Sequence, residues 1–570
     1  MKLKKNCHEA KKELNYSLAF LKDFDKSGWD DMSSKLIRGT FILTLGTFIS
    51  KFLGLFYVIP FYSIIGGEDA ASLYQYGYVP YTIFISIATA GVPLAVSKYI
   101  AKYNALEEYA VGRKLFKSGL VLMTITGFAA FALMYIFAPN FAQMVITSEE
   151  QIYSVEEVAT VIRAVSFALI IVPFMSLMRG FFQGHQSMGP SAVSTVIEQI
   201  ARIIFLLAGA YVVLNVLNGT VVTAVSVATF AAFVGAVFSL LVLFWYWWKR
   251  KPHFDQMLAQ DKGKVNVSLL DMYREIIVYA IPFIFVGIAI PLYQMIDMVT
   301  FNRAMEEIGL AKSADAAFGV LNFSSQKLVI IPVSLATAFA MTLVPLVTSS
   351  FVSGDHSKVK NQLDQTFQVL LFLTVPAAIG ISLLAEPFYT VFYEHSELGT
   401  DVLRVYAPVA IVFALFSVTA AILQGINEQR FTVFSLLVGI LLKLSLNIPL
   451  IKMFETEGAI YATAIGYTAS ILINLLVIRH YANYSLTSVA GSLLRILLFN
   501  VIMSITVLAV YFAVTPWLDE GSKVQATILI IICAGIGAAV YFYLSIRTKL
   551  ADQLFGTRLD RFKKKLRIRG

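Results

Sequence analysis

The sequence predicts an all-α integral membrane protein built from two related six-helix halves and two further helices. Three observations predict this fold: the chain has few charges, apolar runs recur along it, and its lysines and arginines gather in alternate loops. The 570-residue chain is 58% hydrophobic and 14% charged, whereas a soluble domain carries roughly 25% charged residues. So few charges cannot cover a soluble body of this size. A helix crosses the bilayer core with about 20 apolar residues, and such runs recur throughout the chain.

Fourteen segments are candidate membrane-spanning helices. Prolines interrupt several of them, which membrane helices tolerate where neighbouring helices satisfy the freed backbone groups. The predicted spans cover approximately residues 37–64, 75–100, 115–138, 158–179, 190–214, 220–248, 274–301, 316–349, 362–385, 401–424, 430–452, 457–479, 489–514 and 524–547.

The basic residues follow the positive-inside pattern of membrane proteins. They concentrate in both tails and in the loops after the second and sixth spans, while four alternate loops contain no Lys or Arg: 65–73, 139–157, 215–219 and 386–400. We therefore expect both termini to be cytoplasmic, which requires an even number of spans. The net charge of +9 follows from this bias, so we expect no nucleic-acid partner.

Short echoes, six spans apart, indicate that the two halves are repeats. Because six is even, the halves have the same orientation, which is a parallel repeat. The paired positions are Ser86–Ala90 with Ser334–Ala338, Gln183-Gly184 with Gln424-Gly425, Ser194 with Ser435, and Arg202 with Lys443. The predicted organisation is a cytoplasmic tail (1–36), an N-lobe (37–248), a linker (249–273), a C-lobe (274–480), two extra helices (481–548) and a basic tail (549–570).

Motifs of soluble catalysis are absent from the sequence. It has no GxxxxGK[ST] phosphate loop, no HExxH and no GxSxG, and its six histidines and two cysteines are scattered. A membrane glycosyltransferase would need a carboxylate cluster and a sizeable polar loop, but the outward loops are short. We expect a transporter rather than an enzyme, without a metal or cofactor. Membrane potential or a monovalent ion remains a candidate driving force.

Charged residues inside the spans are the candidate functional residues. A charge at the bilayer centre costs at least about 2.5–3.5 kcal/mol, so it should face a wet interior. Four cations fall near mid-depth, against Glu198 as the sole mid-depth acid: Lys51, Arg202, Lys327 and Lys443. This excess predicts a cationic central cavity for an anionic, phosphate-bearing substrate.

Each charge also has a structural alternative. Glu198 and Arg202 are spaced i, i+4 and could neutralise each other. Arg179, at a cytoplasmic helix end, could extend its head group to the membrane surface. Asp297, in the outer third with Arg163, could pair with a basic neighbour. The three mid-depth lysines have no acid three or four positions away, which leaves a partner on another helix open.

At these residues the chain resembles the multidrug/oligosaccharidyl-lipid/polysaccharide (MOP) exporter superfamily. It is most similar to MurJ-type lipid II flippases in their Gram-positive form, near the stage V sporulation protein B-like polysaccharide transporters. The resemblance covers about residues 35–550, and its most specific block is Arg179–Gly184 with Met188 and Pro190. The other motifs are Ser50–Gly54, Ala90–Lys98, Glu198 and Arg202.

The resemblance implies two lobes around a cationic cavity and a groove for a lipid tail at the last two helices. It implies an undecaprenyl-pyrophosphate-linked sugar moved from the inner to the outer leaflet by alternating access. The family's cavity arginines in the first and eighth spans fall on Lys51 and Lys327. A second arginine of the first span is absent, with Phe56 and Tyr57 there, and the arginine of the second span falls near Ile83 or Phe84.

We therefore predict a plasma-membrane flippase for a lipid-linked cell-wall precursor, with lipid II as the first choice. A flippase for another lipid-linked polysaccharide unit and a cation-coupled drug antiporter remain alternatives. Membrane lipids and the cell-wall synthesis machinery are the expected partners. The predicted substrate-binding residues are Lys51, Lys327, Arg202 and Lys443, with Lys98, Arg163, Arg179, Gln183, Glu198 and Asp297 as secondary candidates.

Overall fold

The computed structural model describes residues 42–43, 45–89, 91–265, 267–485 and 487–555, and this part of the chain contains helices and no strand. The N-terminal half holds α3 (Val58–Ile65), α4 (Glu68–Thr89), α5 (Val92–Ala105), α6 (Tyr109–Ile136), α7 (Ala138–Gln143), α8 (Val155–Ser166), α9 (Ala168–Gly184), α10 (Met188–Tyr211), the π-helix η1 (Val212–Val216) and α11 (Val221–Ala259).

The C-terminal half follows the linker. It holds α12 (Leu269–Gly287), α13 (Ala289–Glu307), α14 (Ala311–Gly319), the π-helix η2 (Val320–Ser325), α15 (Gln326–Val352), α16 (His356–Leu383), α17 (Ala385–Phe392), α18 (Glu397–Tyr406), α19 (Val409–Gly425) and α20 (Gln429–Ala482). The chain then adds α21 (Thr487–Val514), the 3-10 helix η3 (Thr515–Trp517), α22 (Lys523–Arg547) and α23 (Leu550–Phe555).

The all-α membrane fold is confirmed, whereas the number of spans is not. Within the described residues, 11 helices are long and apolar enough to cross a membrane, or up to 12 if α18 and α19 form one bent span. Where its residues are described, each predicted span falls on a helix or on consecutive helices, and the start of the first span, 37–41, lies outside the described residues. The total of fourteen stays a prediction. The predicted tail 1–36 and the last part of the basic tail, 556–570, lie outside the described residues.

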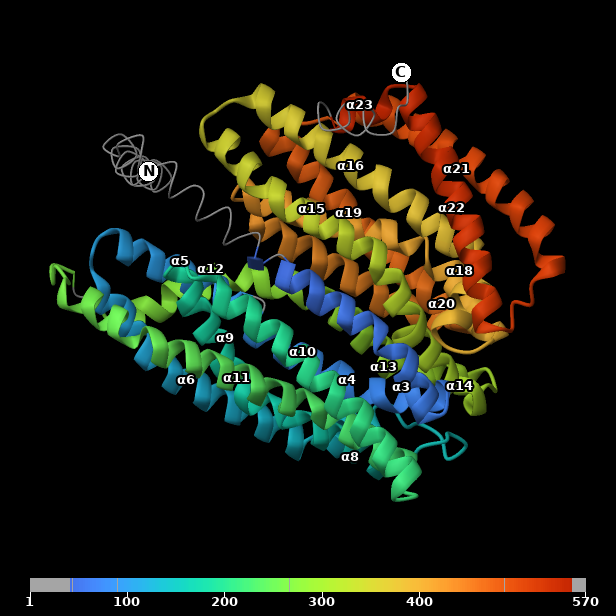
Figure 1. Ribbon diagram of the computed structural model, residues 1–570, viewed down its shortest axis with the longest axis horizontal. Coiled ribbons are helices and arrows are strands. Elements are labelled where there is room, and N and C mark those ends of the chain that lie inside the picture. The colour runs from blue at the N-terminus through green and yellow to red at the C-terminus, as the bar shows by residue number, and fades with distance from the viewer. Residues whose placement is uncertain (1–41, 44, 90, 266, 486, 556–570) are drawn as a thin grey trace.

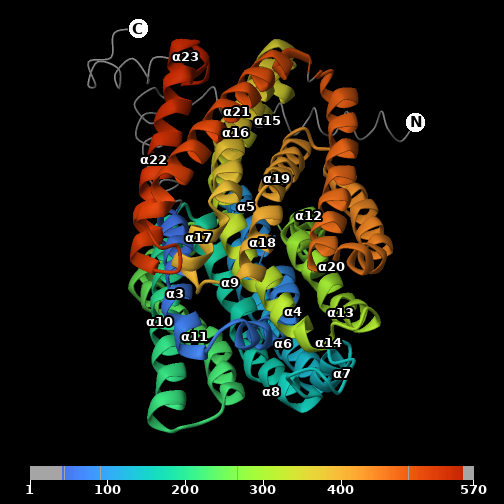
Figure 2. The ribbon, with the colours of Figure 1, turned by 90° about the vertical axis from the view of Figure 1, so that its right-hand side faces the viewer.

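The two halves form two helical bundles that lie side by side (Figure 1). Helices α3, α4, α13 and α14 lie between them, and one hydrophobic core contains residues of both halves. Within that core, Phe61 and Tyr76 of the first half are fully buried with Phe318 and Phe323 of the second. Figure 2 shows α21 and α22 together on the side of the second bundle away from α20. The halves therefore meet along a packed seam centred on α4.

Helix α20 is a hairpin of two spans rather than one rod. Its backbone leaves the helical region at Phe454 and Glu455. Side chains then pair across the arms, as Ser435 does with Asn474 and Lys443 with Thr463. Residue numbers rise along the first arm while the numbers of the paired residues on the second arm fall, so the two arms run antiparallel. They coincide with the predicted spans 430–452 and 457–479.

The structure repeats one turn at equivalent places in the two halves. After α9, the backbone amide of Gln186 donates to the carbonyl oxygen of Gln183, and the backbone amide of Ser187 donates to the carbonyl oxygen of Phe182. After α19, the pattern is the same: the backbone amide of Asn427 donates to the carbonyl oxygen of Gln424, and that of Glu428 donates to the carbonyl oxygen of Leu423. Gln186 and Asn427 both have positive φ, 55° and 62°. The Gln-Gly echo of the sequence thus marks the same helix end twice.

A first prediction concerns the bend of α20. Glu455 has φ 49° and ψ −131°, a region costly for residues with a Cβ but open to glycine. We expect Glu455→Gly to keep or raise the Tm of the purified protein, and Glu455→Val to lower the stability by about 1 kcal/mol or more. Thermal unfolding in detergent measures both. Equal Tm values for the two variants would contradict a strained bend.

Candidate functional site

Two of the four predicted cavity cations lie among aromatic side chains at the seam between the halves. Arg202 comes from α10 of the first half, and Lys327 comes from the first turn of α15 in the second. The aromatic residues between them belong to the first span, α4 and η2: Tyr57, Phe61, Tyr74, Tyr78 and Phe323. The site is therefore built by both halves.

Arg202 is held by neutral partners. Its Nη2 donates to the hydroxyl oxygens of Tyr78 at 2.8 Å and Tyr74 at 3.3 Å. Its guanidinium carbon also lies 5.2 Å from the centroid of the Tyr78 ring, within the range of a cation–π contact. These contacts orient the guanidinium without neutralising it.

Lys327 is held in the same manner from the other half. Its Nζ donates to the Tyr57 hydroxyl at 3.0 Å and lies 4.2 Å from the centroid of the Phe323 ring. Because Tyr57 belongs to the first span, this bond joins the halves. Within the described residues, neither Lys327 nor Arg202 has an ion pair with a carboxylate.

Packed rings connect the two cations. The Phe323 ring centroid lies 5.6 Å from that of Tyr74, which lies 5.3 Å from that of Tyr78. The cations are thus fixed by one aromatic cluster, which we call the tyrosine cluster: Tyr57, Phe61, Tyr74, Tyr78 and Phe323. Two cations with only neutral partners in a poorly solvated seam attract a multiply charged anion such as a pyrophosphate.

Arg179 and Glu198 form the ion pair of the first half. Arg179 Nη2 lies 2.7 Å from Glu198 Oε2, and both side chains are 17% exposed. Arg179 also donates to the hydroxyls of Ser194 and Ser239. The alternatives of a Glu198–Arg202 pair and of an Arg179 head group at the membrane surface are therefore wrong. The pair ties α9 to α10, and it leaves Arg202 without its predicted neighbour.

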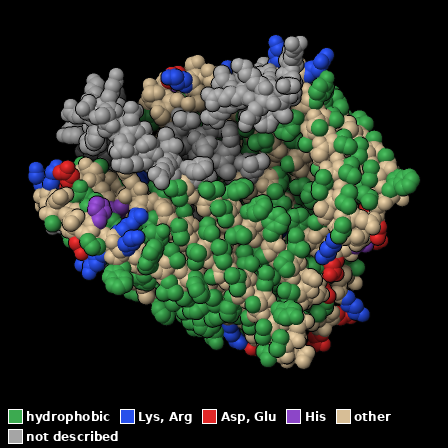
Figure 3. All heavy atoms as spheres, in the orientation of Figure 1, with side chains coloured by type: hydrophobic (Ala, Val, Ile, Leu, Met, Phe, Trp, Pro, Cys, Tyr) green, Lys and Arg blue, Asp and Glu red, His purple; other side chains and the backbone are tan. Residues whose placement is uncertain are grey.

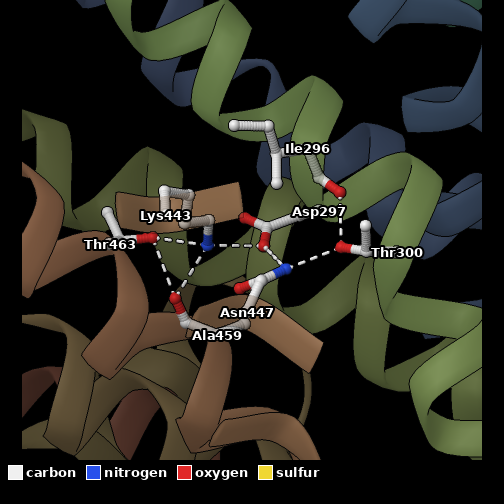
Figure 4. Close-up of polar contacts among 7 residues, drawn as sticks. All are labelled: Ile296, Asp297, Thr300, Lys443, Asn447, Ala459 and Thr463. Atoms are coloured by element: carbon white, nitrogen blue, oxygen red, sulfur yellow. Dashed lines mark hydrogen bonds and ion pairs between the residues drawn. The ribbon is translucent and has the colours of Figure 1, made fainter. Parts of the chain in front are cut away.

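Lys443 lies inside the second half and not among the tyrosines. The side chain is fully buried, and Nζ lies 2.6 Å from Asp297 Oδ1, 2.8 Å from Thr463 Oγ1 and 2.9 Å from the Ala459 carbonyl oxygen. Asn447 donates to the same Asp297 oxygen at 3.0 Å. Figure 4 shows this network, in which the three ammonium hydrogens all have acceptors. The Asp297 pairing and the inter-helix partner left open by the sequence are both observed.

The remaining predicted residues lie apart from the tyrosine cluster. Lys51 is exposed in the helical segment before α3 and has no ion pair with a described residue. Lys98 is exposed on α5, and Gln183 is half-buried near the end of α9. Arg163 pairs with Glu156 at 2.8 Å on α8. Of the predicted set, the structure brings together three pairs: Arg202 with Lys327 through the tyrosine cluster, Arg179 with Glu198, and Lys443 with Asp297.

The tyrosines are the residues that sequence reasoning missed. Tyr74 and Tyr78 are spaced i, i+4 and therefore share one face of α4. The run Tyr74-Gln-Tyr-Gly-Tyr78 carries three hydroxyls inside an apolar span, which is the signal that could have found them. Asn447 and Thr463, which complete the Lys443 network, could have been found as polar residues facing the hairpin's interior.

The comparisons with known proteins concern the family and the fold. Residues 36–351 match a family described as polysaccharide biosynthesis protein, and residues 282–448 match the MatE family. The chain is 48% identical to the lipid II flippase MurJ of Bacillus subtilis (strain 168), over 95% of this chain and 100% of that protein. Stage V sporulation protein B of the same strain is 22% identical, over 77% of this chain and 82% of its own length.

Solved structures show the same fold. A lipid II flippase MurJ in an inward closed conformation aligns with a TM-score of 0.64 and 16% identity, covering 90% of this chain and 99% of that one. An inward-facing multidrug resistance MATE transporter of the MOP superfamily aligns with a TM-score of 0.61 and 15% identity, covering 76% and 94%. At these identities the structural likeness speaks for the fold alone.

Proposed function

Because the chain belongs to the MurJ family of lipid II flippases, we propose that it moves an undecaprenyl-pyrophosphate-linked cell-wall precursor, lipid II in the first place, from the inner to the outer leaflet. The observation that carries the proposal is the pair of cations in the tyrosine cluster, which have neutral partners only. A pyrophosphate presents several anionic oxygens, and both cations are charged donors suited to such oxygens.

In the proposed mechanism, the pyrophosphate displaces the tyrosine hydroxyls from the two cations. Arg202 has a planar fork of donors suited to two phosphate oxygens, whereas Lys327 supplies a single point charge. The halves then rock about the bound head group while the lipid tail stays in the membrane. Lys51, which is exposed in the first span and not held in the cluster, is the proposed contact of the head group outside the cluster.

We place the protein in the plasma membrane with both termini in the cytoplasm. The basis is the distribution of Lys and Arg between alternate loops. Membrane voltage is the proposed aid to the reset step, because returning one uncompensated positive charge through 100 mV is worth about 2.3 kcal/mol. The cell-wall synthesis machinery, which supplies and consumes the precursor, is the proposed partner.

A drug antiporter is the weaker candidate for this chain. Such a transporter would use free deep carboxylates to exchange cations. In this structure Glu198, the one acid that the sequence places at mid-depth, is already paired with Arg179, and Asp297 is paired with Lys443. The pairing therefore favours an anionic substrate over a cationic one.

Depletion of the protein tests the substrate directly. We expect lipid II to accumulate in the inner leaflet of depleted cells and its exposure on the outer leaflet to fall. Extraction of lipid-linked precursors, with labelling of those exposed outside, measures both. Normal lipid II exposure together with accumulation of another lipid-linked glycan would replace lipid II as the substrate.

A third prediction concerns the two lysines that fall on the family's cavity positions. We expect Lys327→Ala and Lys51→Ala each to lower flipping, and Lys327→Ala to lower it more because Lys327 is fixed in the cluster. Lys358→Ala is the matched control, since Lys358 is a surface lysine with a side chain 72% exposed. Normal flipping and growth in both variants at normal expression would contradict the site.

A further inference from the structure

A buried carboxylate joins the two halves at one end of the molecule. Asp315 lies on α14 of the second half and is fully buried. Its Oδ1 accepts hydrogen bonds from the Tyr76 hydroxyl at 2.6 Å and from Gln151 Nε2 at 3.2 Å, and its Oδ2 accepts one from the Ile152 amide at 2.9 Å. All three donors belong to the first half.

A second polar bond strengthens the same junction. Asn302 of α13 donates to the Tyr76 hydroxyl at 2.7 Å and to the Val145 carbonyl at 3.0 Å. The Tyr76 hydroxyl therefore accepts from Asn302 while it donates to Asp315. The Tyr76 ring stacks on that of Phe318, with centroids 4.6 Å apart. These bonds hold α4 and the segment after α7 against the second half.

The backbones of α4 and α14 touch beside this carboxylate. A Cβ on Gly319 would lie 2.4 Å from the Glu68 carbonyl oxygen and 2.9 Å from the Ser72 amide nitrogen. Real Cβ atoms do not approach backbone so closely, so the contact depends on glycine. The hydrogen bonds of Asp315 need this close approach, because α14 must lie against α4 to bring the carboxylate to its donors.

The hydrogen-bond donors to Asp315 are all neutral. Among the described residues, no Lys or Arg forms an ion pair with it, so three neutral donors alone stabilise the buried carboxylate. When the halves separate, water can hydrate the carboxylate, which offsets much of the loss of those bonds. At the opposite end, the ion pair of Lys102 with Glu275 has both side chains nearly half exposed, and such pairs contribute little.

We propose that Asp315, with its donors Tyr76, Gln151 and Ile152, is a latch that closes the transport path on the side of loop 139–157. This inference rests on the proposed transport function. Opening of the latch releases the substrate on the outer side of the membrane, where the loops without Lys or Arg are predicted to lie. Asp315 is therefore a positioning residue, since it sets the state of the seam and does not contact the substrate.

The latch can be tested without any substrate. Spin labels on cysteines at Glu150 in the first half and Glu397 in the second, both exposed, report the separation of the halves in nanodiscs. Cys7 and Cys533 are first replaced so that only the introduced cysteines carry labels. We expect one compact distance population in the otherwise unchanged protein. Asp315→Asn replaces one acceptor oxygen by an amide group whose hydrogens face hydrogen-bond donors. We therefore expect this variant to show an additional population with a longer distance between the labels.

The expected rise in the open-to-closed ratio is about tenfold, equivalent to about 1.4 kcal/mol. Tyr76→Phe removes one donor and keeps the ring, so it serves if Asp315→Asn does not fold. Gly319→Ala should open the seam by sterics alone. The controls are Asp401→Asn, at an exposed carboxylate, and Gly380→Ala, where no atom lies within 4 Å of the added Cβ.

Unchanged distances in folded Tyr76→Phe and Gly319→Ala proteins would overturn the latch. A shift in these variants but not in the controls supports it. Because the distances are measured without lipid II, this result is independent of the substrate. If the lipid II assay fails while the distance shifts, the proposed substrate is wrong and the latch is still supported.

Discussion

Asp297→Ala is expected to prevent most of the protein from reaching a stable folded state. The substitution leaves the fully buried ammonium of Lys443 with a hydroxyl and a carbonyl as acceptors but no counter-charge. Removing one partner of a buried ion pair costs about 3–5 kcal/mol, which is comparable with the whole stability of many proteins. We expect a low yield of monodisperse protein and a strongly reduced Tm in detergent.

A double substitution distinguishes lost charge balance from lost packing. Asp297→Ala with Lys443→Met removes both charges and keeps an apolar chain of similar length, so it should recover most of the Tm. The control is Asp401→Ala, because the Asp401–Arg404 pair is exposed and its loss should cost less than about 1 kcal/mol. A single Asp297→Ala variant as stable as this control would show that the pair is unimportant for folding.

Arg202→Met is expected to abolish most flipping while leaving the protein folded. Methionine keeps an apolar side chain of similar length, and Tyr74 and Tyr78 keep hydroxyls that can bond water. Loss of one hydrogen bond to a charged group, worth about 2 kcal/mol, corresponds to about a 30-fold lower rate. A reconstituted assay of lipid II exposure measures the rate, and Arg202→Lys should retain part of it because it keeps the charge but not the fork.

Arg163→Met is the matched control for Arg202→Met. Arg163 also lies on a helix of the first half, but it pairs with the exposed Glu156 outside the tyrosine cluster. We expect it to flip at close to the normal rate. Equal losses in the two variants, or a normal rate in Arg202→Met, would contradict the assignment of Arg202 to the substrate site.

The fold followed from the sequence because a membrane imposes a simple rule. Every span needs an apolar run, so the predicted spans could be found one by one, and the Gln-Gly echo located equivalent helix ends. The family prediction is confirmed by the 48% identity to a lipid II flippase. The bend at Phe454 and Glu455 lies in the gap between the predicted spans 430–452 and 457–479, although its backbone geometry is not recorded in hydropathy. The total of fourteen spans stays a prediction.

The site was predicted only in part, for a physical reason. Charges in an apolar run are visible one at a time, so Arg202 and Lys327 could be selected. Their partners come from other helices, and helical spacing cannot reveal them: Glu198 pairs with Arg179 across a turn rather than with Arg202 four residues away. Asp297 meets Lys443 across 146 positions of sequence. From the sequence, Tyr74 and Tyr78 look like ordinary residues of an apolar span, whereas in the structure both hydroxyls accept hydrogen bonds from Arg202.

The buried network of the α20 hairpin has a consequence for biosynthesis. Inserting a lysine at mid-membrane costs about 2.5–3.5 kcal/mol, and the first arm of α20 carries Lys443 before its acceptors Ala459 and Thr463 of the second arm have been made. Asp297 on α13 is synthesised earlier, and it too lacks its partner Lys443 until the first arm of α20 has been made. The second half is therefore expected to stay incompletely assembled at the translocon until the whole hairpin has emerged, when both charges enter the membrane interior together.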